Sequence, residues 1–494
     1  MAKRDYTDDW KPLLERLDAE RTRARAMGGP ERVERFLHAR GKLDARQRIL
    51  RLFDPGTFVE IGGLVGNQEG VPADAFVCGA GAIDGRPAMA GVEDFSTLAG
   101  SIGAGGTAKR HRIAELAKQE RVPLVMMLEG AGHRLTDTGH GRAPNDLLAL
   151  ADLNGHVPMV CLVLGASAGH GALAAPLSDF VVMSEAGAMF TGGPPLVKAA
   201  TGEEVTKEEL GGPKVCAEIA GSVHNVAADD AAAIDLARAY LSHFPSHAGG
   251  ALPRRDGADT GPRPLDELLA ILPPNDRLPY RMRRVIELVV DDGRYLEVQP
   301  GYGKSVITAL AFVGGRAVGI VANDPSHKAG AMDSAAAIKA MDFLDTLHPF
   351  GHPVVFLADN PGVMAGTKAE REGILKWGGK MFRSERRLRG PKIYVAMRKA
   401  FGFGMVTMAG TPFDHQTMTF TLPGVNLASM PAASGGRAAK LDEDAQRAAE
   451  EAQRAGPYRL ANGLGVDDVI DPRELRNAIL GALALARGRE PAGR

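Results

Sequence analysis

The stretch PMVCLVLGASAGHGALAAPLSDF, residues 158–180, decides how this chain folds. Its first part, Met159 to Leu164, is a short apolar run typical of a buried strand in a parallel sheet. A glycine-rich segment follows, and we expect a helix after it. Glycines at such a place let backbone N–H groups turn outward at a helix N-terminus, which favours negative charge. The stretch therefore predicts an oxyanion-binding loop formed by Gly169, His170 and Gly171.

The same pattern occurs a second time. PKIYVAMRKAFGFG, residues 391–404, aligns with the first stretch at a constant shift of 233, which pairs Gly169 with Gly402. Upstream, a shift of 230 pairs Gly132 with Gly362. Internal repetition determines architecture, so it takes priority over single motifs. We expect two halves built on one plan, with a second oxyanion loop at Gly402, Phe403 and Gly404.

The length also favours two domains. A chain of 494 residues exceeds one compact core. Residues 249–264 are rich in glycine, proline and charge, which makes them the best candidate for a linker. We therefore predict domains at residues 1–255 and 256–494, each beginning with a helix and continuing into a strand hairpin.

Charge and cysteine content exclude several classes of function. There are 59 Lys+Arg and 60 Asp+Glu residues, with no long block of like charge, so we expect neither nucleic acid nor an anionic membrane as a partner. Three scattered cysteines are too few for a disulfide framework or a four-thiolate zinc site, and we predict no metal. The N-terminus has no secretory signal, and prolines and glycines interrupt the apolar window at residues 157–177. A cytoplasmic protein is expected.

The sequence resembles the carboxyltransferase (beta) subunits of biotin-dependent acyl-CoA carboxylases, and is close to the methylcrotonyl-CoA and propionyl-CoA carboxylase beta chains. The resemblance spans nearly the whole chain. The most specific motif is GPPLVKAATGEEV at residues 193–205, and GVMAG at residues 362–366 supports it.

The resemblance implies an α/β fold of two tandem crotonase-like domains, each a series of repeated ββα units. It implies that the first domain binds acyl-CoA and the second binds carboxybiotin. In such enzymes the active site lies between the first domain of one subunit and the second domain of another, so an oligomer, typically a hexamer, is implied. Biotin would be attached to a separate biotin carboxylase/biotin carboxyl carrier alpha subunit, because this chain has no Met-Lys-Met acceptor sequence and no evident ATP-site signature.

The implied reaction creates two oxyanions, a thioester enolate and a biotin ureido anion. Preorganised backbone donors can contribute about 3–4 kcal/mol at each. We assign the thioester oxygen to the loop at Gly169 to Gly171 and the biotin oxygen to the loop at Gly402 to Gly404. In the family mechanism the released ureido nitrogen takes the substrate proton. The residues expected to shape the pockets are Gly100, Ala131, Gly132 and Val406 for the substrate, and Pro361 and Gly362 for the cofactor.

Several positions depart from the family pattern. His170 stands where glycine is common and Phe403 where a small residue is common, so the backbone angles of both loops are in question. Val406 stands where some short-chain carboxylases have an acidic residue, which favours an acyl group larger than acetyl or propionyl. His133 and His170 flank the first loop, and a structural role is favoured over a chemical one for both. The same holds for Glu129 and Asp359.

Other functions compete with this hypothesis. A decarboxylase or biotin-independent acyl-CoA enzyme on the same scaffold is one alternative, motivated by His170 and Phe403. A non-catalytic assembly subunit is another, which absence of acyl-CoA binding would favour. The acyl group, the partner and the number of subunits are left open by the sequence.

Overall fold

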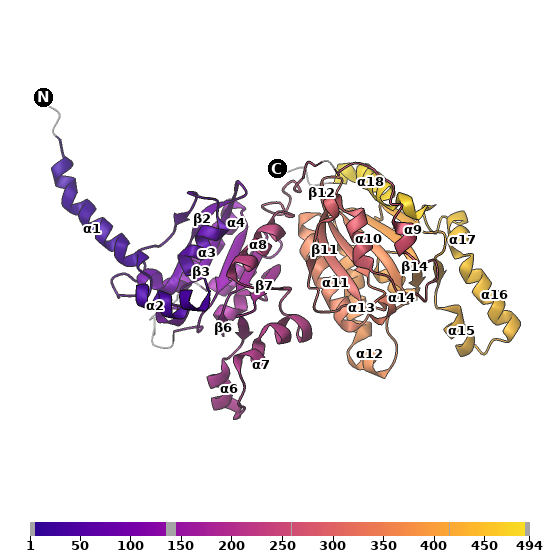
Figure 1. The fold of residues 1–494 in the computed structure, drawn as a ribbon, viewed down its shortest axis with the longest axis horizontal. Coiled ribbons are helices and arrows are strands. Elements are labelled where there is room, and N and C mark those ends of the chain that lie inside the picture. The colour runs from indigo at the N-terminus through magenta and orange to yellow at the C-terminus, as the bar shows by residue number, and fades with distance from the viewer. Residues whose placement is uncertain (1–4, 135–144, 258, 414, 490–494) are drawn as a thin grey trace. The chain divides into compact units, whose positions relative to one another are not determined.

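The computed structural model describes residues 5–134, 145–257, 259–413 and 415–489, and the contacts divide the chain into two compact units, residues 1–241 and 242–494 (Figure 1). The sequence placed the boundary after residue 255. Residues 254 and 255 pair with the second unit, since Arg254 forms a β-bridge with Arg316 and the Arg255 N–H donates to the Gly315 carbonyl oxygen. None of the helices in these ranges is long and apolar enough to cross a bilayer.

The first unit contains a mixed sheet whose strand order is β1-β2-β3-β4-β5-β7-β9, and β6 and β8 pair as a separate two-stranded sheet. Its strands are β1 (Val59–Glu60), β2 (Phe76–Ile83), β3 (Arg86–Glu93), β4 (Leu124–Leu128), β5 (Met159–Val163), β6 (Ala166–Ala168), β7 (Phe180–Ser184), β8 (Ala188–Phe190) and β9 (Asn225–Ala227). Its helices are α1 (Thr7–Arg25), α2 (Pro30–Phe36), α3 (Ala45–Leu52), α4 (Ala104–Glu120), α5 (Asp146–Ala151), α6 (Pro194–Thr201), α7 (Lys207–Gly211) and α8 (Asp230–Leu241). The first three strands pair antiparallel, and from β3 onward the sheet is parallel.

The second unit repeats this plan with the order β10-β11-β12-β13-β14-β15-β17. Its strands are β10 (Tyr295–Val298), β11 (Val306–Val313), β12 (Arg316–Asn323), β13 (Val354–Asn360), β14 (Lys392–Phe401), β15 (Met418–Thr421), β16 (Asn426–Ala428) and β17 (Asp468–Val469). Its helices are α9 (Leu268–Ile271), α10 (Met282–Val289), α11 (Ser334–Leu347), α12 (Thr367–Arg371), α13 (Ile374–Arg387), α14 (Gly402–Thr407), α15 (Ala432–Ala438), α16 (Glu443–Arg454), α17 (Gly456–Asn462) and α18 (Leu475–Leu485). The predicted duplication of one α/β plan is confirmed.

The duplication extends to single hydrogen bonds. The predicted hairpin turn at Asp84 and Gly85 has φ of 50° and 75°, and the Asp54 carboxylate accepts the Gly85 N–H at 2.8 Å. In the second unit the Asp291 carboxylate accepts the Gly315 N–H at 2.7 Å in the same way. Each hairpin therefore has its turn amides satisfied by an acid from the preceding helix–strand connection.

One expectation about the central stretch was wrong. No α-helix follows the first glycine loop; the short strand β6 precedes Gly169, and after it the chain forms only a 3₁₀ turn, Gly171–Ala174. Pro176 lies just beyond this turn, and it has no N–H to donate to a helical hydrogen bond. In the second unit, α14 follows β14 directly, as expected.

A buried lysine occupies equivalent positions in both units. Lys109 Nζ donates to the carbonyl oxygens of Ala73 and Phe76, and Lys339 Nζ donates to those of Tyr302 (3.1 Å) and Val306 (2.8 Å). Each lysine ties the helix after the hairpin to the chain that enters the hairpin. Burial lowers the pKa of Lys339 to about 7.

We expect Lys339→Met to lower the free energy of unfolding by about 1–3 kcal/mol, because two buried carbonyl groups lose their donor. The unfolded chain keeps an ordinary lysine pKa of 10.5, so it binds more protons than the folded chain between about pH 7 and 10.5. Stability contributed by this lysine therefore rises with pH in that window. Melting temperatures at pH 7 and pH 9 should show a larger gap between wild type and variant at pH 9. Lys368→Met, at a lysine whose side chain is 89% exposed, should leave the melting temperature unchanged.

Candidate functional site

In the first unit, two glycine loops meet at the carboxyl ends of β4 and β5/β6. Gly132 has φ of 84°, and a Cβ there would lie 2.6 Å from the Ala168 carbonyl oxygen. Gly100, on a third segment, also lies close to the chain after β4, because a Cβ on it would lie 2.4 Å from the Glu129 carbonyl oxygen. The fold therefore brings together six predicted residues, and we call them the first cradle: Gly100, Ala131, Gly132 and the Gly169–Gly171 loop.

The structure distinguishes available amides from occupied ones in this cradle. The Gly169 N–H donates to the Phe190 carbonyl oxygen at 3.1 Å, and the Ala131 N–H donates to that of Ala99 at 3.0 Å. Neither amide is therefore free to bind a substrate oxygen, although Gly169 belongs to the predicted oxyanion loop. Within the described ranges, the N–H groups of Gly132, His170 and Gly171 have no hydrogen-bond acceptor. These three amides are the donors that the first cradle offers.

The second unit forms an equivalent second cradle from the Pro361–Gly362 loop and the Gly402–Gly404 turn. Gly402 has φ of 51°, close to the 56° of Gly169. A Cβ on Gly404 would lie 2.8 Å from the Gly362 Cα. The Gly362 N–H donates to Asn360 Oδ1 at 2.7 Å and Pro361 has no N–H, so this loop shapes the cradle without supplying a donor. The amides of Phe403 and Gly404 lie in the first turn of α14, where N–H groups lack intrahelical acceptors.

A buried carboxylate follows the central strand of each unit. Glu129 pairs with Lys42 and, at 2.5 Å, with Arg48. Asp359 pairs with Arg398 at 2.8 Å and with Lys399 at 3.4 Å. All these charges are buried or nearly so, and their mutual pairing fits the structural role favoured for both acids.

A chain of buried charges runs beneath the first cradle, and the sequence analysis missed it. His170 Nε2 lies 2.6 Å from Asp146 Oδ1, and Asp146 Oδ2 accepts from Arg110 Nε at 2.7 Å. Arg110 also donates to Glu93 at 3.0 Å, and Glu93 accepts the Glu129 N–H at 2.8 Å. Burial raises the pKa of Glu93. For Asp146, burial acts in the same direction, but the hydrogen bond with His170 and the charge of Arg110 lower its pKa overall.

No sequence signal could have grouped these side chains, because Glu93, Arg110 and Asp146 come from β3, α4 and α5. The predicted pair of histidines is partly brought together: the ring centroids of His133 and His170 lie 6.1 Å apart. His170 has an acidic partner, whereas His133 forms no side-chain hydrogen bond with any described residue.

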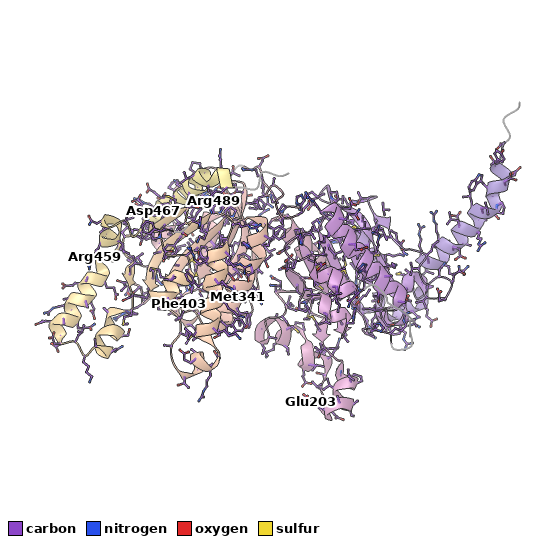
Figure 2. The ribbon with its side chains drawn as sticks, turned by 180° about the vertical axis from the view of Figure 1, so that it is seen from behind. Glu203, Met341, Phe403, Arg459, Asp467 and Arg489 are labelled. Atoms are coloured by element: carbon purple, nitrogen blue, oxygen red, sulfur yellow. The ribbon has the colours of Figure 1, made fainter. Side chains whose placement is uncertain are left out.

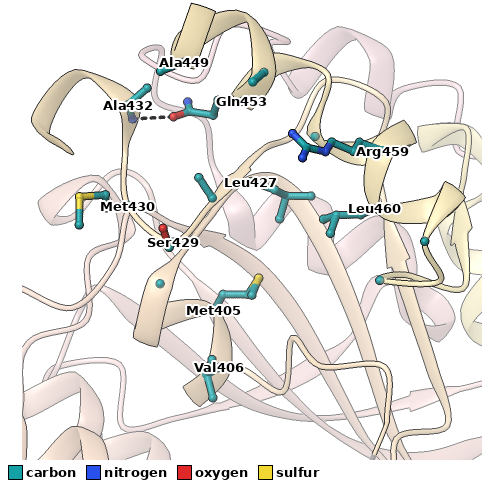
Figure 3. Close-up of a pocket in the computed structure, with 16 residues that line it drawn as sticks. Met405, Val406, Leu427, Ser429, Met430, Ala432, Ala449, Gln453, Arg459 and Leu460 are labelled. Carbon is teal, nitrogen blue, oxygen red and sulfur yellow. Dashed lines mark hydrogen bonds between the residues drawn. The ribbon is translucent and has the colours of Figure 1, made fainter. Parts of the chain in front are cut away.

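An apolar cavity of about 840 Å³ adjoins the second cradle (Figure 3). Gly402, Met405 and Val406 form one side of it, and β16 with α15, α16 and α17 forms the others. Figure 2 labels Phe403, which belongs to the second cradle, and Arg459, which lines the cavity. The polar lining is sparse, and Gln453 already accepts the Ala432 N–H at 2.7 Å. Val406 therefore lines an apolar cavity, as its side chain suggested.

Metal and thiol chemistry gain no support from the described residues. No cluster of three or more His, Cys, Asp or Glu side chains that could hold a metal ion occurs among them. The three cysteines are buried, and burial raises the pKa of the Cys78 thiol to about 11.

Residues 37–491 match the carboxyl transferase domain family. The chain belongs to this family. The 12S subunit of methylmalonyl-CoA carboxyltransferase from Propionibacterium freudenreichii subsp. shermanii is 36% identical over 96% of this chain and 94% of its own length. The alpha subunit of methylmalonyl-CoA decarboxylase from Veillonella parvula is 34% identical over 96% and 95%. The biotin-dependent acetyl-/propionyl-coenzyme A carboxylase beta5 subunit from Mycobacterium tuberculosis is 34% identical over 92% and 89%.

A solved structure shares the fold. Transcarboxylase 12S, determined as a hexamer assembly with methylmalonyl-coenzyme A and methylmalonic acid bound, aligns with a TM-score of 0.91 and 34% identity over 98% of this chain and 97% of its own. The predicted family, the crotonase-like two-domain fold and the carboxyltransferase activity are thereby confirmed, and a carboxyltransferase is favoured over the alternatives.

The second cradle can be tested with a pair of glycine substitutions. We expect Gly404→Ala to lower the rate of carboxyl transfer by about 10²-fold or more, because its Cβ would collide with Gly362 and Asn360 and force the Gly404 amide away from its position as a donor. Gly424→Ala is the matched control, since its Cβ would meet no atom within 4 Å. Equal loss in both variants, measured as kcat at saturating thioester, would contradict the assignment.

Proposed function

We propose that this protein is the carboxyltransferase subunit of a biotin-dependent acyl-CoA carboxylase, with the acyl thioester bound by the first cradle and carboxybiotin by the second. The observation that carries the proposal is the pair of equivalent cradles. Each is built from two glycine loops at the carboxyl ends of parallel strands, and each presents main-chain amides. Duplicated donors suit a reaction in which charge develops on two oxygens.

The residues of each cradle have separate tasks. The amides of Gly132 and His170 hold the thioester oxygen as it gains charge, while Gly100 and Ala131 fix the loop that positions Gly132. The amides of Phe403 and Gly404 hold the biotin carbonyl oxygen, while Pro361 and Gly362 shape the opposite wall. Carboxybiotin, when bound, supplies the carboxyl group. Biotin is attached to a separate alpha subunit that also carries the biotin carboxylase activity.

We place the complete site between the first unit of one copy and the second unit of another, within a homo-oligomer that is a hexamer. The hexamer assembly of transcarboxylase 12S supports this arrangement. In this arrangement the acyl group extends from the first cradle of one copy toward Val406 of another. The protein acts in the cytoplasm.

The decisive experiment is purification from the native host followed by detection of a co-eluting biotinylated protein. The purified complex should incorporate labelled bicarbonate into acyl-CoA in the presence of ATP. Release of CO₂ from carboxylated thioesters without ATP or a biotinylated partner would instead favour the decarboxylase alternative.

The acyl group is larger than propionyl, because the cavity beside Val406 is apolar and has a volume of about 840 Å³. We expect Ala449→Phe to reduce kcat/KM for octanoyl-CoA by about tenfold or more, because excluding apolar groups from a pocket costs about 1–3 kcal/mol. The kcat/KM for propionyl-CoA should stay within about twofold of the wild-type value. Ala448→Phe, on the same helix but outside the cavity lining, should change neither value. A uniform loss for both thioesters would contradict the acyl assignment.

A further inference from the structure

We propose that His170, held by Asp146, is the general base that removes the α-proton of the bound acyl thioester. This inference rests on the proposed function, because it assumes that the first cradle binds the thioester. It assigns chemistry to a side chain, whereas the cradle itself acts only through main-chain amides.

The first argument is the position of the imidazole. The backbone N–H of His170 is one of the free donors of the first cradle, so its own side chain begins next to the bound oxygen. The side chain is 25% exposed. In the bound thioester the α-carbon is one bond from the carbonyl carbon, so a base must lie beside the oxygen site, where the His170 side chain begins.

The second argument is the way in which the ring is held. Nε2 lies 2.6 Å from Asp146 Oδ1, and Asp146 is completely buried. Its other oxygen is fixed by Arg110, which Glu93 fixes in turn. An imidazole oriented by a buried carboxylate is the arrangement that stabilises the protonated ring after it has taken a proton. Nδ1 forms no hydrogen bond with any described residue and is the nitrogen left for the substrate.

In the proposed proton transfer, the Cα–H bond of the thioester breaks and its proton goes to neutral His170 Nδ1. The electron pair of that bond moves to the thioester oxygen, which the Gly132 and His170 amides hold. The new C–C bond then forms with the carboxyl carbon delivered by carboxybiotin. The imidazolium returns its proton to the biotin nitrogen that gave up the carboxyl group. Asp146 remains ionised throughout and acts as a positioning residue.

The test is deuterium incorporation at the α-carbon of propionyl-CoA and octanoyl-CoA in D₂O, followed by mass spectrometry, with the full chain and no biotinylated partner. Without biotin, exchange faster than that of the thioester alone in the same buffer comes from a protein base. We expect the wild type to incorporate deuterium and His170→Gln to lower the rate by about 10²-fold or more. Calorimetry of the same thioesters with the same proteins reports binding separately.

Two further variants separate a chemical from a structural role. His170→Gly removes the ring, and added imidazole should restore exchange, which a purely structural histidine would not show. Asp146→Asn should slow exchange, and added imidazole should not restore it, because the ring is still present. His111→Gln is the matched control: His111 is 26% exposed and lies 3.3 Å from Glu115, yet it belongs to α4 and not to the cradle, so exchange should be unchanged.

The inference is overturned if the wild type binds the thioesters but incorporates no deuterium, or if His170→Gln exchanges as fast as the wild type. Failure of the proposed function looks different: neither thioester binds, or the complex incorporates no bicarbonate. Exchange that depends on His170 and responds to imidazole supports the inference.

Discussion

The close approach of two main-chain segments in each unit is the constraint on which the site depends. At the first cradle a Cβ on Gly132 would lie 2.6 Å from a carbonyl oxygen, and at the second a Cβ on Gly404 would lie 2.8 Å from a Cα. Real side chains cannot occupy such positions, so glycine is required at both. The approach is possible because β4 and β5, like β13 and β14, are parallel neighbours whose carboxyl ends face the same edge of the sheet.

The two units neutralise equivalent buried acids by different means. In the second unit the cation is Arg398, which belongs to β14 itself and pairs with Asp359. At the corresponding position the first unit has Gly165, where even a Cβ would lie 2.3 Å from Glu129 Oε1. Glu129 is instead paired with Lys42 and Arg48 from the segment that precedes the sheet. The glycine interrupts the strand into β5 and β6, whereas β14 is continuous.

The side chains around the cradles have diverged more than the backbones. His170 in the first cradle leads into a chain of buried charges through Asp146, Arg110 and Glu93. Phe403, its counterpart, packs edge-to-face against Phe382 with centroids 6.0 Å apart, and its neighbour Gly402 lines an apolar cavity. The first cradle is therefore surrounded by charged side chains, and the second adjoins apolar ones. Such divergence is what a duplicated scaffold needs if its two sites bind different molecules.

Much of the fold was determined by the sequence alone, because it depends on local chemistry or on repetition. The hairpin turn at Asp84 and Gly85 depends on two adjacent residues that tolerate positive φ, and the Asp44 side chain caps α3. The constant shift between the halves predicted two equivalent sheets before any strand pairing was known. The glycine loops were located for the same reason.

Only the tertiary structure decided which groups in those loops are available. The Gly169 N–H is occupied by Phe190 of β8, the helix expected after the first loop is replaced by a 3₁₀ turn, and His170 meets an aspartate from α5. Each of these outcomes depends on a partner distant in sequence, and no local pattern specifies where such a partner lies. Glycine spacing determined where the backbone must approach, whereas long-range packing determined what that backbone binds and which side chains surround it.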